Sequence, residues 1–91
     1  MITEQKKKAL IAIKKANSLT NKIIEMIEGG DYCIDIMQQN LAAIGLLRSA
    51  HESLMESHLN GCFKSAMQTN NAKKQDQMTQ EILKVTKLFN K

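Results

Sequence analysis

The fold is decided by residues 31–67, DYCIDIMQQNLAAIGLLRSAHESLMESHLNGCFKSAM. One set of residues in this stretch recurs at steps of three or four, which is the spacing of one face of an α-helix. The set is Met37, Leu41, Ile44, Leu47, His51, Leu54, His58 and Cys62. The chain contains no proline, and strand-like runs of β-branched and aromatic residues are missing. The stretch therefore predicts one long helix over about residues 32–67.

A helix of this length predicts an oligomer. At 1.5 Å per residue it is about 50 Å long, whereas a domain of this size has a radius of gyration of about 13 Å. The rest of a 91-residue chain cannot cover its apolar face. We expect the long helices of two copies to pair antiparallel and to form a four-helix bundle with both first helices.

A first helix is predicted over about residues 3–28, with Thr3 as its N-cap. Its apolar side chains mark one face at helical spacing. They are Leu10, Ile13, Ala16, Ile23, Ile24 and Ile27. Gly29 and Gly30 end this helix, and Asp31 is expected to cap the long helix that follows.

A third helix is predicted over about residues 73–90, after a polar loop at 68–74. Its apolar residues are Met78, Ile82, Val85 and Phe89, at steps of four, three and four. No linker divides the chain. We therefore expect residues 1–91 to form a single all-α domain of three helices.

Lysines gather in the first helix. The net charge of the chain is +4. The first 22 residues contain six lysines but only one acidic residue, Glu4. They are Lys6, Lys7, Lys8, Lys14, Lys15 and Lys22. The seven-residue repeats among them place the lysines as a stripe along the helix. Such a stripe suits a polyanion partner such as DNA, although a solvated helix face is an equal alternative.

Three residues form a candidate metal site. His58 and Cys62 are four apart in a helix and project from one side. Cys33 lies 25 residues before His58, about 37 Å away along a helix. In an antiparallel dimer whose long helices cross near Leu47 or Arg48, Cys33 of one copy lies opposite His58 and Cys62 of the other copy.

Two thiolates and one imidazole form a soft, three-coordinate donor set that suits Cu(I). Zn(II) would need a fourth ligand at the same atoms, and Zn(II) or Ni(II) can bind such a set in vitro. The alternative is structural: Cys33 and Cys62 would be small buried hydrophobes and His58 an interfacial histidine. We interpret His51, on the same stripe, as an interfacial polar residue.

Other classes of function find little support. The sequence contains no glycine-rich phosphate loop, paired catalytic carboxylates or nucleophile motif, so we expect neither an enzyme nor a small-molecule substrate. It contains no apolar run long enough for a bilayer and no hydrophobic leader, so we expect a cytoplasmic protein without a membrane partner. Reduced cysteines are then expected, which favours metal or redox chemistry over a structural disulfide.

Two segments resemble the copper-sensitive operon repressor family (CsoR/RcnR/FrmR type). They are Asp31-Tyr32-Cys33-Ile34-Asp35-Ile36-Met37-Gln38-Gln39 and Glu56-Ser57-His58-Leu59-Asn60-Gly61-Cys62-Phe63. The resemblance implies a disc-shaped tetramer, a dimer of antiparallel dimers, that represses metal-efflux genes. Cys33, His58 and Cys62 match the family's copper-sensing set. Nickel or cobalt sensors would place a histidine at position 62, persulfide sensors lack the histidine, and formaldehyde sensors lack the last cysteine.

The resemblance also assigns supporting residues. Tyr32 and Glu81 would hydrogen-bond around the metal ligands, and operator DNA would be bound by a basic set. That set is Lys7, Lys8, Lys14, Lys15, Lys22 and Arg48. Family members usually carry arginines and an Arg-Gly-Gln-like trio in the first helix, where this chain has Lys14-Lys15-Ala16-Asn17-Ser18-Leu19. Lysine attracts phosphate without the bidentate geometry of arginine.

The predicted function is a Cu(I)-responsive transcriptional repressor. The apo form would bind operator DNA, and Cu(I) held by Cys33 of one subunit with His58 and Cys62 of the other would release it. Copper-efflux genes would then be derepressed. Two alternatives remain open from the residues: a repressor switched by a thiol or persulfide bond, and a copper-binding protein that has lost DNA binding.

Overall fold

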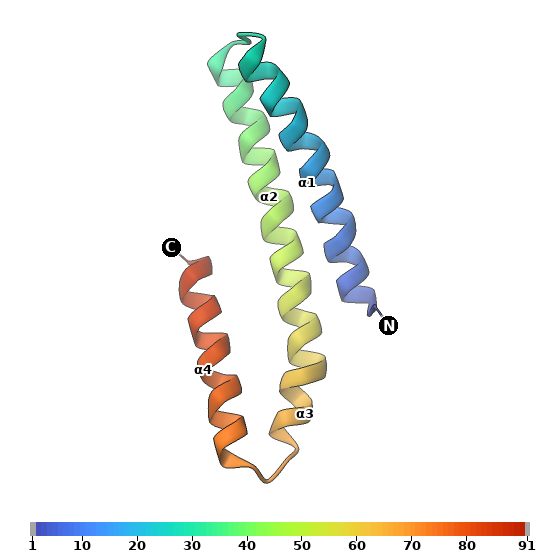
Figure 1. Cartoon of the computed structure of the whole chain (residues 1–91), viewed down its shortest axis with the longest axis vertical. Coiled ribbons are helices and arrows are strands. Elements are labelled where there is room, and N and C mark those ends of the chain that lie inside the picture. The colour runs from blue at the N-terminus through green and yellow to red at the C-terminus, as the bar shows by residue number, and fades with distance from the viewer. Residues whose placement is uncertain (1, 91) are drawn as a thin grey trace. The chain divides into compact units, whose positions relative to one another are not determined.

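The structure is a computed structural model that describes residues 2–90. Figure 1 shows its elements, all of them helical over these residues. They are α1 (Glu4–Glu28), α2 (Cys33–His58), the π-helical turn η1 (Leu59–Phe63), α3 (Lys64–Met67) and α4 (Ala72–Phe89). The prediction of an all-α protein is confirmed, since residues 2–90 contain no strand.

The long helical stretch contains a feature that the sequence pattern did not predict. From Cys33 to Met67 the elements α2, η1 and α3 follow one another without an intervening loop. Between Leu59 and Phe63, however, the hydrogen bonding changes from α to π. A π turn accommodates an extra residue in the helix, and such turns occur frequently at functional sites.

The start of α1 is capped as expected. Thr3 has an extended backbone, and its Oγ1 accepts a hydrogen bond from the Lys6 N–H at 3.1 Å. This bond satisfies one of the amides that a helix start leaves without an intrahelical partner. The N-cap prediction for Thr3 is therefore confirmed.

The end of α1 reverses the chain within a few residues. Gly30 has a φ of 71°, in the left-handed region that glycine adopts without a steric cost. The N–H of Asp31 then donates to the Met26 carbonyl at 3.0 Å, which closes the turn. The expected capping of α2 by Asp31 is wrong, because α2 begins at Cys33 and Tyr32 directly precedes it. Residues 31 and 32 are used to reverse the chain.

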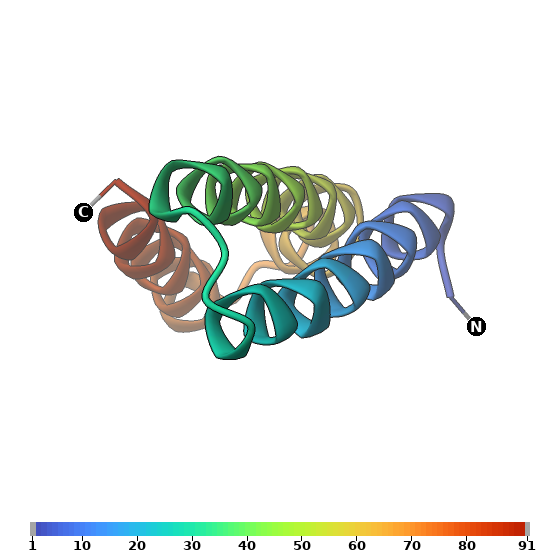
Figure 2. The same cartoon turned by 90° about the horizontal axis from the view of Figure 1, so that it is seen from above.

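α1 and α2 form an antiparallel hairpin, seen from two directions in Figures 1 and 2. The residues buried in this hairpin are mostly small and recur at helical spacing. They are Ala9, Ala12, Ala16 and Ile23 in α1, and Ala43, Ala50 and Ser57 in α2. Ala9, Ala12 and Ala50 form one buried cluster. Alanine has only a methyl side chain, so two helices that meet through alanines can approach closely.

Most of the large apolar side chains of the hairpin remain exposed. The apolar face predicted for α1 is buried only in part: Ala16 and Ile23 lie in the buried seam. The other predicted members, Leu10, Ile13, Ile24 and Ile27, are exposed. In α2 the apolar stripe from which the long helix was predicted is also exposed. Its members Met37, Leu41, Ile44, Leu47 and Leu54 are 58%, 66%, 40%, 47% and 46% exposed. An exposed apolar area of this extent indicates an interaction surface.

Residues 58–90 belong to a second compact unit. Its loop between α3 and α4 is held by side chains: the Gln75 amide donates to the carbonyls of Met67 (3.3 Å) and Thr69 (2.7 Å). Asn71 caps α4 by accepting from the Lys74 N–H at 3.1 Å. The loop is thus shorter than predicted. Within residues 2–90, no helix is long and apolar enough to cross a membrane.

The alanine seam predicts the effect of enlarging a buried residue. Ala50 is 1% exposed, so Ala50→Leu must push α1 and α2 apart and should destabilise the protein by about 1–3 kcal/mol. Urea denaturation followed by circular dichroism measures this change. Ala42→Leu is the matched control, because Ala42 is exposed on the same helix. Equal stability of the two variants would contradict the seam.

Candidate metal centre

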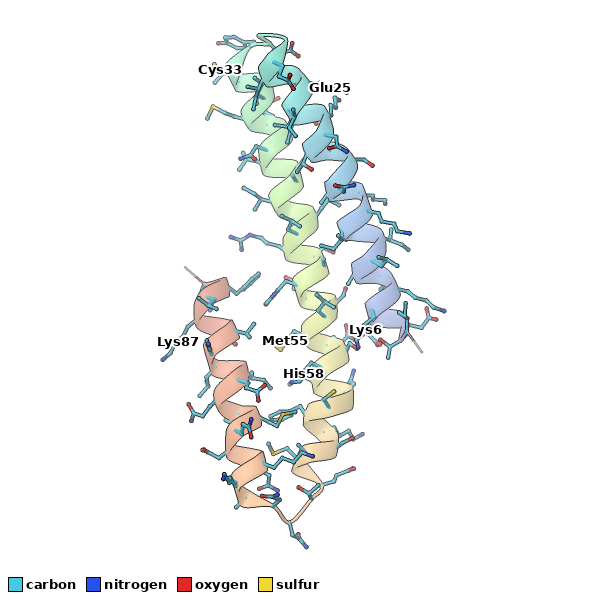
Figure 3. The ribbon with its side chains drawn as sticks, in the orientation of Figure 1. Lys6, Glu25, Cys33, Met55, His58 and Lys87 are labelled. Atoms are coloured by element: carbon cyan, nitrogen blue, oxygen red, sulfur yellow. The ribbon has the colours of Figure 1, made fainter. Side chains whose placement is uncertain are left out.

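Cys33 is positioned by the turn between α1 and α2. It is the first residue of α2, and its thiol is free and exposed. The carbonyl of Tyr32, one residue earlier, accepts the Ile36 N–H at 3.2 Å. Figure 3 shows Cys33 at the hairpin end of α2, whereas Lys6 lies near the opposite end of α1. The sequence thus places a soft, accessible donor at one end of the long helix.

His58 and Cys62 lie at the other end of the long helical stretch. His58 is the last residue of α2 and half-buried, and Cys62 is exposed within η1. Four residues are close to one turn both in an α-helix and in the wider π turn. The imidazole and the thiol therefore project from similar sides of the helix. Gly61, inside the same turn, meets no neighbouring atom at its missing Cβ position.

No single place in the chain gathers all three donors. Within the part of the chain that the structure describes, no group of three His, Cys, Asp or Glu side chains is arranged to hold a metal ion. Cys33 and His58 are the first and last residues of α2, about 37 Å apart at 1.5 Å per residue. A three-donor site made of these residues requires a second chain.

The predicted supporting residues lie in different elements. Tyr32 is exposed (69%) beside Cys33. Glu81 is exposed on α4. The roles of Tyr32 and Glu81 around the metal remain predictions. His51 is half-buried on α2.

The lysines predicted to bind DNA are exposed along α1. Lys7 forms an ion pair with Glu4 at 3.4 Å, in which both side chains are well exposed. Such a surface pair contributes little and does not prevent Lys7 from binding a phosphate. Arg48 is exposed on α2. The charge of the basic set is thus accessible from solvent.

One residue next to the predicted site was missed by the sequence analysis. Ser57 directly precedes His58 and is buried, at 7% exposure. Its Oγ lies 3.0 Å from Oγ1 of Thr3, the N-cap of α1. Ser57 follows Ala43 and Ala50 at seven-residue steps, so the heptad of the buried seam was the signal that could have identified it.

The donor chemistry of these residues fits Cu(I). Two thiols and an imidazole are soft to intermediate ligands, and low-coordinate Cu(I) accepts such a set. Both thiols are free rather than joined in a disulfide. Harder ions prefer clusters of carboxylates. The described residues around Cys33 and Cys62 include no such cluster and no third cysteine. The residues of this chain therefore match a soft metal better than Mg²⁺ or Ca²⁺.

Comparison with known proteins identifies the family. The sequence model of the family described as metal-sensitive transcriptional repressor matches residues 5–91. The chain therefore belongs to the metal-sensitive transcriptional repressor family. The resemblance drawn from the Cys33 and His58–Cys62 segments is confirmed at this level.

Several relatives are described as copper sensors. The copper-sensing transcriptional repressor CsoR of Mycobacterium ulcerans (strain Agy99) is 35% identical over 66 residues, which cover 72% of this chain and 56% of that protein. The copper-sensing transcriptional repressor RicR of Mycobacterium tuberculosis (strain ATCC 25618 / H37Rv) is 32% identical over 65 residues, or 71% and 68% of the two chains. The chain thus spans little more than half the length of the Mycobacterium ulcerans relative.

A solved structure shares the fold. The crystal structure of the copper-sensing repressor CsoR with Cu(I) from Geobacillus thermodenitrificans NG80-2 matches with a TM-score of 0.84 and 27% sequence identity. The match covers 100% of this chain and 92% of that chain. The all-helical architecture is therefore that of a member of the same family.

The π turn predicts the effect of replacing its glycine. Gly61→Ala should stabilise the protein by up to about 1 kcal/mol, because alanine is the better helix former and the new methyl meets no atom. Gly45→Ala is the control, since Gly45 lies in α2 with equally open surroundings. Urea denaturation compares the two. Destabilisation by Gly61→Ala alone would show that the π turn depends on glycine.

Proposed function

We propose that this chain is a Cu(I)-responsive transcriptional repressor of the CsoR type that acts in the cytoplasm. The observation that carries the proposal is the distribution of donors along the long helix. Cys33 begins α2, while His58 ends it and Cys62 follows in η1. Between the two ends runs an exposed apolar stripe. A second copy that covers the stripe in antiparallel orientation completes two equivalent metal sites.

The stripe supports antiparallel pairing by its own symmetry. The midpoint of positions 33 and 62 falls between Leu47 and Arg48. About this point Leu41 is matched by Leu54, and Ile44 by His51. Met37 is likewise matched by His58, whereas Leu47 meets Arg48. Most apolar positions of one helix therefore meet a stripe position of the other, and burial of this surface favours the dimer. Two such dimers would form the tetramer that the family resemblance implies.

In this dimer Cys33 of one subunit would hold Cu(I) together with His58 and Cys62 of the other. The bound ion supplies a cross-link between subunits. The free ring nitrogen of His58 needs a partner that fixes its orientation, as metal-bound histidines generally do. Glu81 or Tyr32 would accept the hydrogen bond that this ring N–H donates. Zn(II) and Ni(II) are weaker candidates for the same donors because they require further ligands.

The operator would be bound by the lysines of α1. Lys7, Lys8, Lys14, Lys15 and Lys22 are exposed on one helix, and Arg48 is exposed on α2. Lysines attract phosphates without reading bases, so affinity should depend strongly on salt and specificity on DNA shape. A conformation stabilised by Cu(I) would present this surface less favourably. Linkage then requires DNA to weaken Cu(I) binding by the same factor.

The metal site is tested by an anaerobic Cu(I) titration of the reduced protein against a competing chelator. We expect about one Cu(I) per chain, with an affinity reduced by about 100-fold or more in Cys62→Ala, because a thiolate ligand is lost. Weak binding that is indifferent to Cys62 would contradict copper sensing. Cross-linked dimers in mass spectra of oxidant- or persulfide-treated protein would then favour a thiol switch between the exposed Cys33 and Cys62.

The intersubunit arrangement is tested by mixing two inactive variants. Cys33→Ala and Cys62→Ala homodimers each lack every complete site, whereas a heterodimer of the two retains one. After unfolding and refolding together, we expect about one tight Cu(I) per four chains from random pairing of subunits. If the refolded equal mixture binds no Cu(I) tightly although each variant is folded, a site shared between subunits is contradicted.

The DNA surface is tested by fluorescence anisotropy with a duplex from the upstream region of the protein's own gene. Lys14→Gln should weaken binding and lower the slope of log K against log salt by about 1, because one phosphate contact is lost. Lys73→Gln is the control, since Lys73 is an exposed lysine of α4 outside the basic set. Equal effects of the two substitutions would indicate nonspecific attraction only.

A further inference from the structure

A partly buried hydrogen bond joins two residues that lie far apart in the sequence. The hydroxyl oxygens of Thr3 and Ser57 are 3.0 Å apart, although 54 positions separate them. Ser57 is 7% exposed, and it is the buried polar residue of the helical hairpin. A buried hydroxyl that loses its partner is costly, so this bond should persist when either end moves.

Thr3 also determines where α1 begins. Its Oγ1 accepts the Lys6 N–H at 3.1 Å as the N-cap. The same oxygen therefore contacts Ser57 on one side and the first turn of α1 on the other. Lys6, Lys7 and Lys8 follow within that turn and the next. A displacement of the Ser57 hydroxyl is transmitted directly to the start of the lysine-bearing helix.

Ser57 is likewise fixed to the proposed metal ligand. It directly precedes His58 in the last turn of α2, so the two residues share one turn of backbone. Any rotation of this turn that carries His58 towards a shared ligand must also move Ser57. The bond to Thr3 then carries the start of α1 with it.

We propose that Ser57 is a positioning residue that couples the His58 end of α2 to the DNA-binding lysines at the start of α1, through its hydrogen bond with Thr3. This inference rests on the proposed function and adds to it the group that links the metal site to the DNA surface. Ser57 touches neither metal nor DNA in this scheme. Its contribution is a coupling free energy between two sites.

The test compares four proteins: wild type, Ser57→Ala, Thr3→Ser and Ser49→Ala. Ser57→Ala removes the bond but leaves the N-cap of α1 intact, and alanine is well tolerated in a helix. Thr3→Ser keeps the hydroxyl and should behave as wild type. Ser49→Ala is the matched control, an exposed serine of the same helix. Each protein is assayed for Cu(I) affinity, and for DNA affinity with and without Cu(I).

We expect Ser57→Ala to bind Cu(I) as tightly as wild type does in the absence of DNA. The factor by which Cu(I) weakens DNA binding should fall by about tenfold, within the usual range of allosteric coupling. In the metal-free proteins, hydrogen exchange of the first-turn amides of α1 should be faster in Ser57→Ala than in wild type, and unchanged in Thr3→Ser and Ser49→Ala. This second readout is independent of copper.

The outcomes separate the two proposals. A wild-type protein whose DNA binding ignores Cu(I) would overturn the proposed function and, with it, the coupling role. A responsive wild type with an equally responsive Ser57→Ala, or with unchanged exchange at the start of α1, would overturn the coupling role alone. A loss of response in Ser49→Ala as large as that in Ser57→Ala would also overturn it.

Discussion

The structure depends on the close approach of α1 and α2 through small side chains. Ala9, Ala12 and Ala50 form a buried cluster of the hairpin. Because alanines fill most of the seam between the two helices, most of the isoleucines and leucines of both helices are left on the outer faces. The hairpin therefore buries little apolar surface by itself, and in the proposed dimer association with a second copy would provide what the monomer lacks.

The proposed metal site follows from the same constraint. A long helix whose outer face is apolar must meet a partner, and antiparallel pairing is the arrangement that brings its two ends together. Cys33 stands at one end and the His58–Cys62 pair at the other. Neither end holds three donors, so in the proposed dimer metal binding and subunit association would be one event. In such a protein the metal reports on, and stabilises, a particular arrangement of subunits.

The π turn and the Thr3–Ser57 bond both lie beside the His58–Cys62 pair in the sequence. The π turn Leu59–Phe63 begins directly after His58 and contains Cys62, without a break in the helix. The hydroxyl of Ser57 joins the residue before His58 to the cap of the basic helix. The end of α2 thus carries both a departure from regular α-helix and a partly buried polar contact, as expected of a functional element.

Much of this protein was determined by its sequence alone, because helical periodicity and residue chemistry are local. The all-α class, the Thr3 cap, the glycine turn and the family were predicted from such patterns, and so were the candidate donors Cys33, His58 and Cys62. Only the tertiary structure decided which of two apolar faces of α1 is buried, since alanines compete poorly with isoleucines in any hydrophobicity pattern but allow closer packing. It also decided the π turn and the Thr3–Ser57 bond, because both depend on contacts and backbone geometry that spacing does not encode.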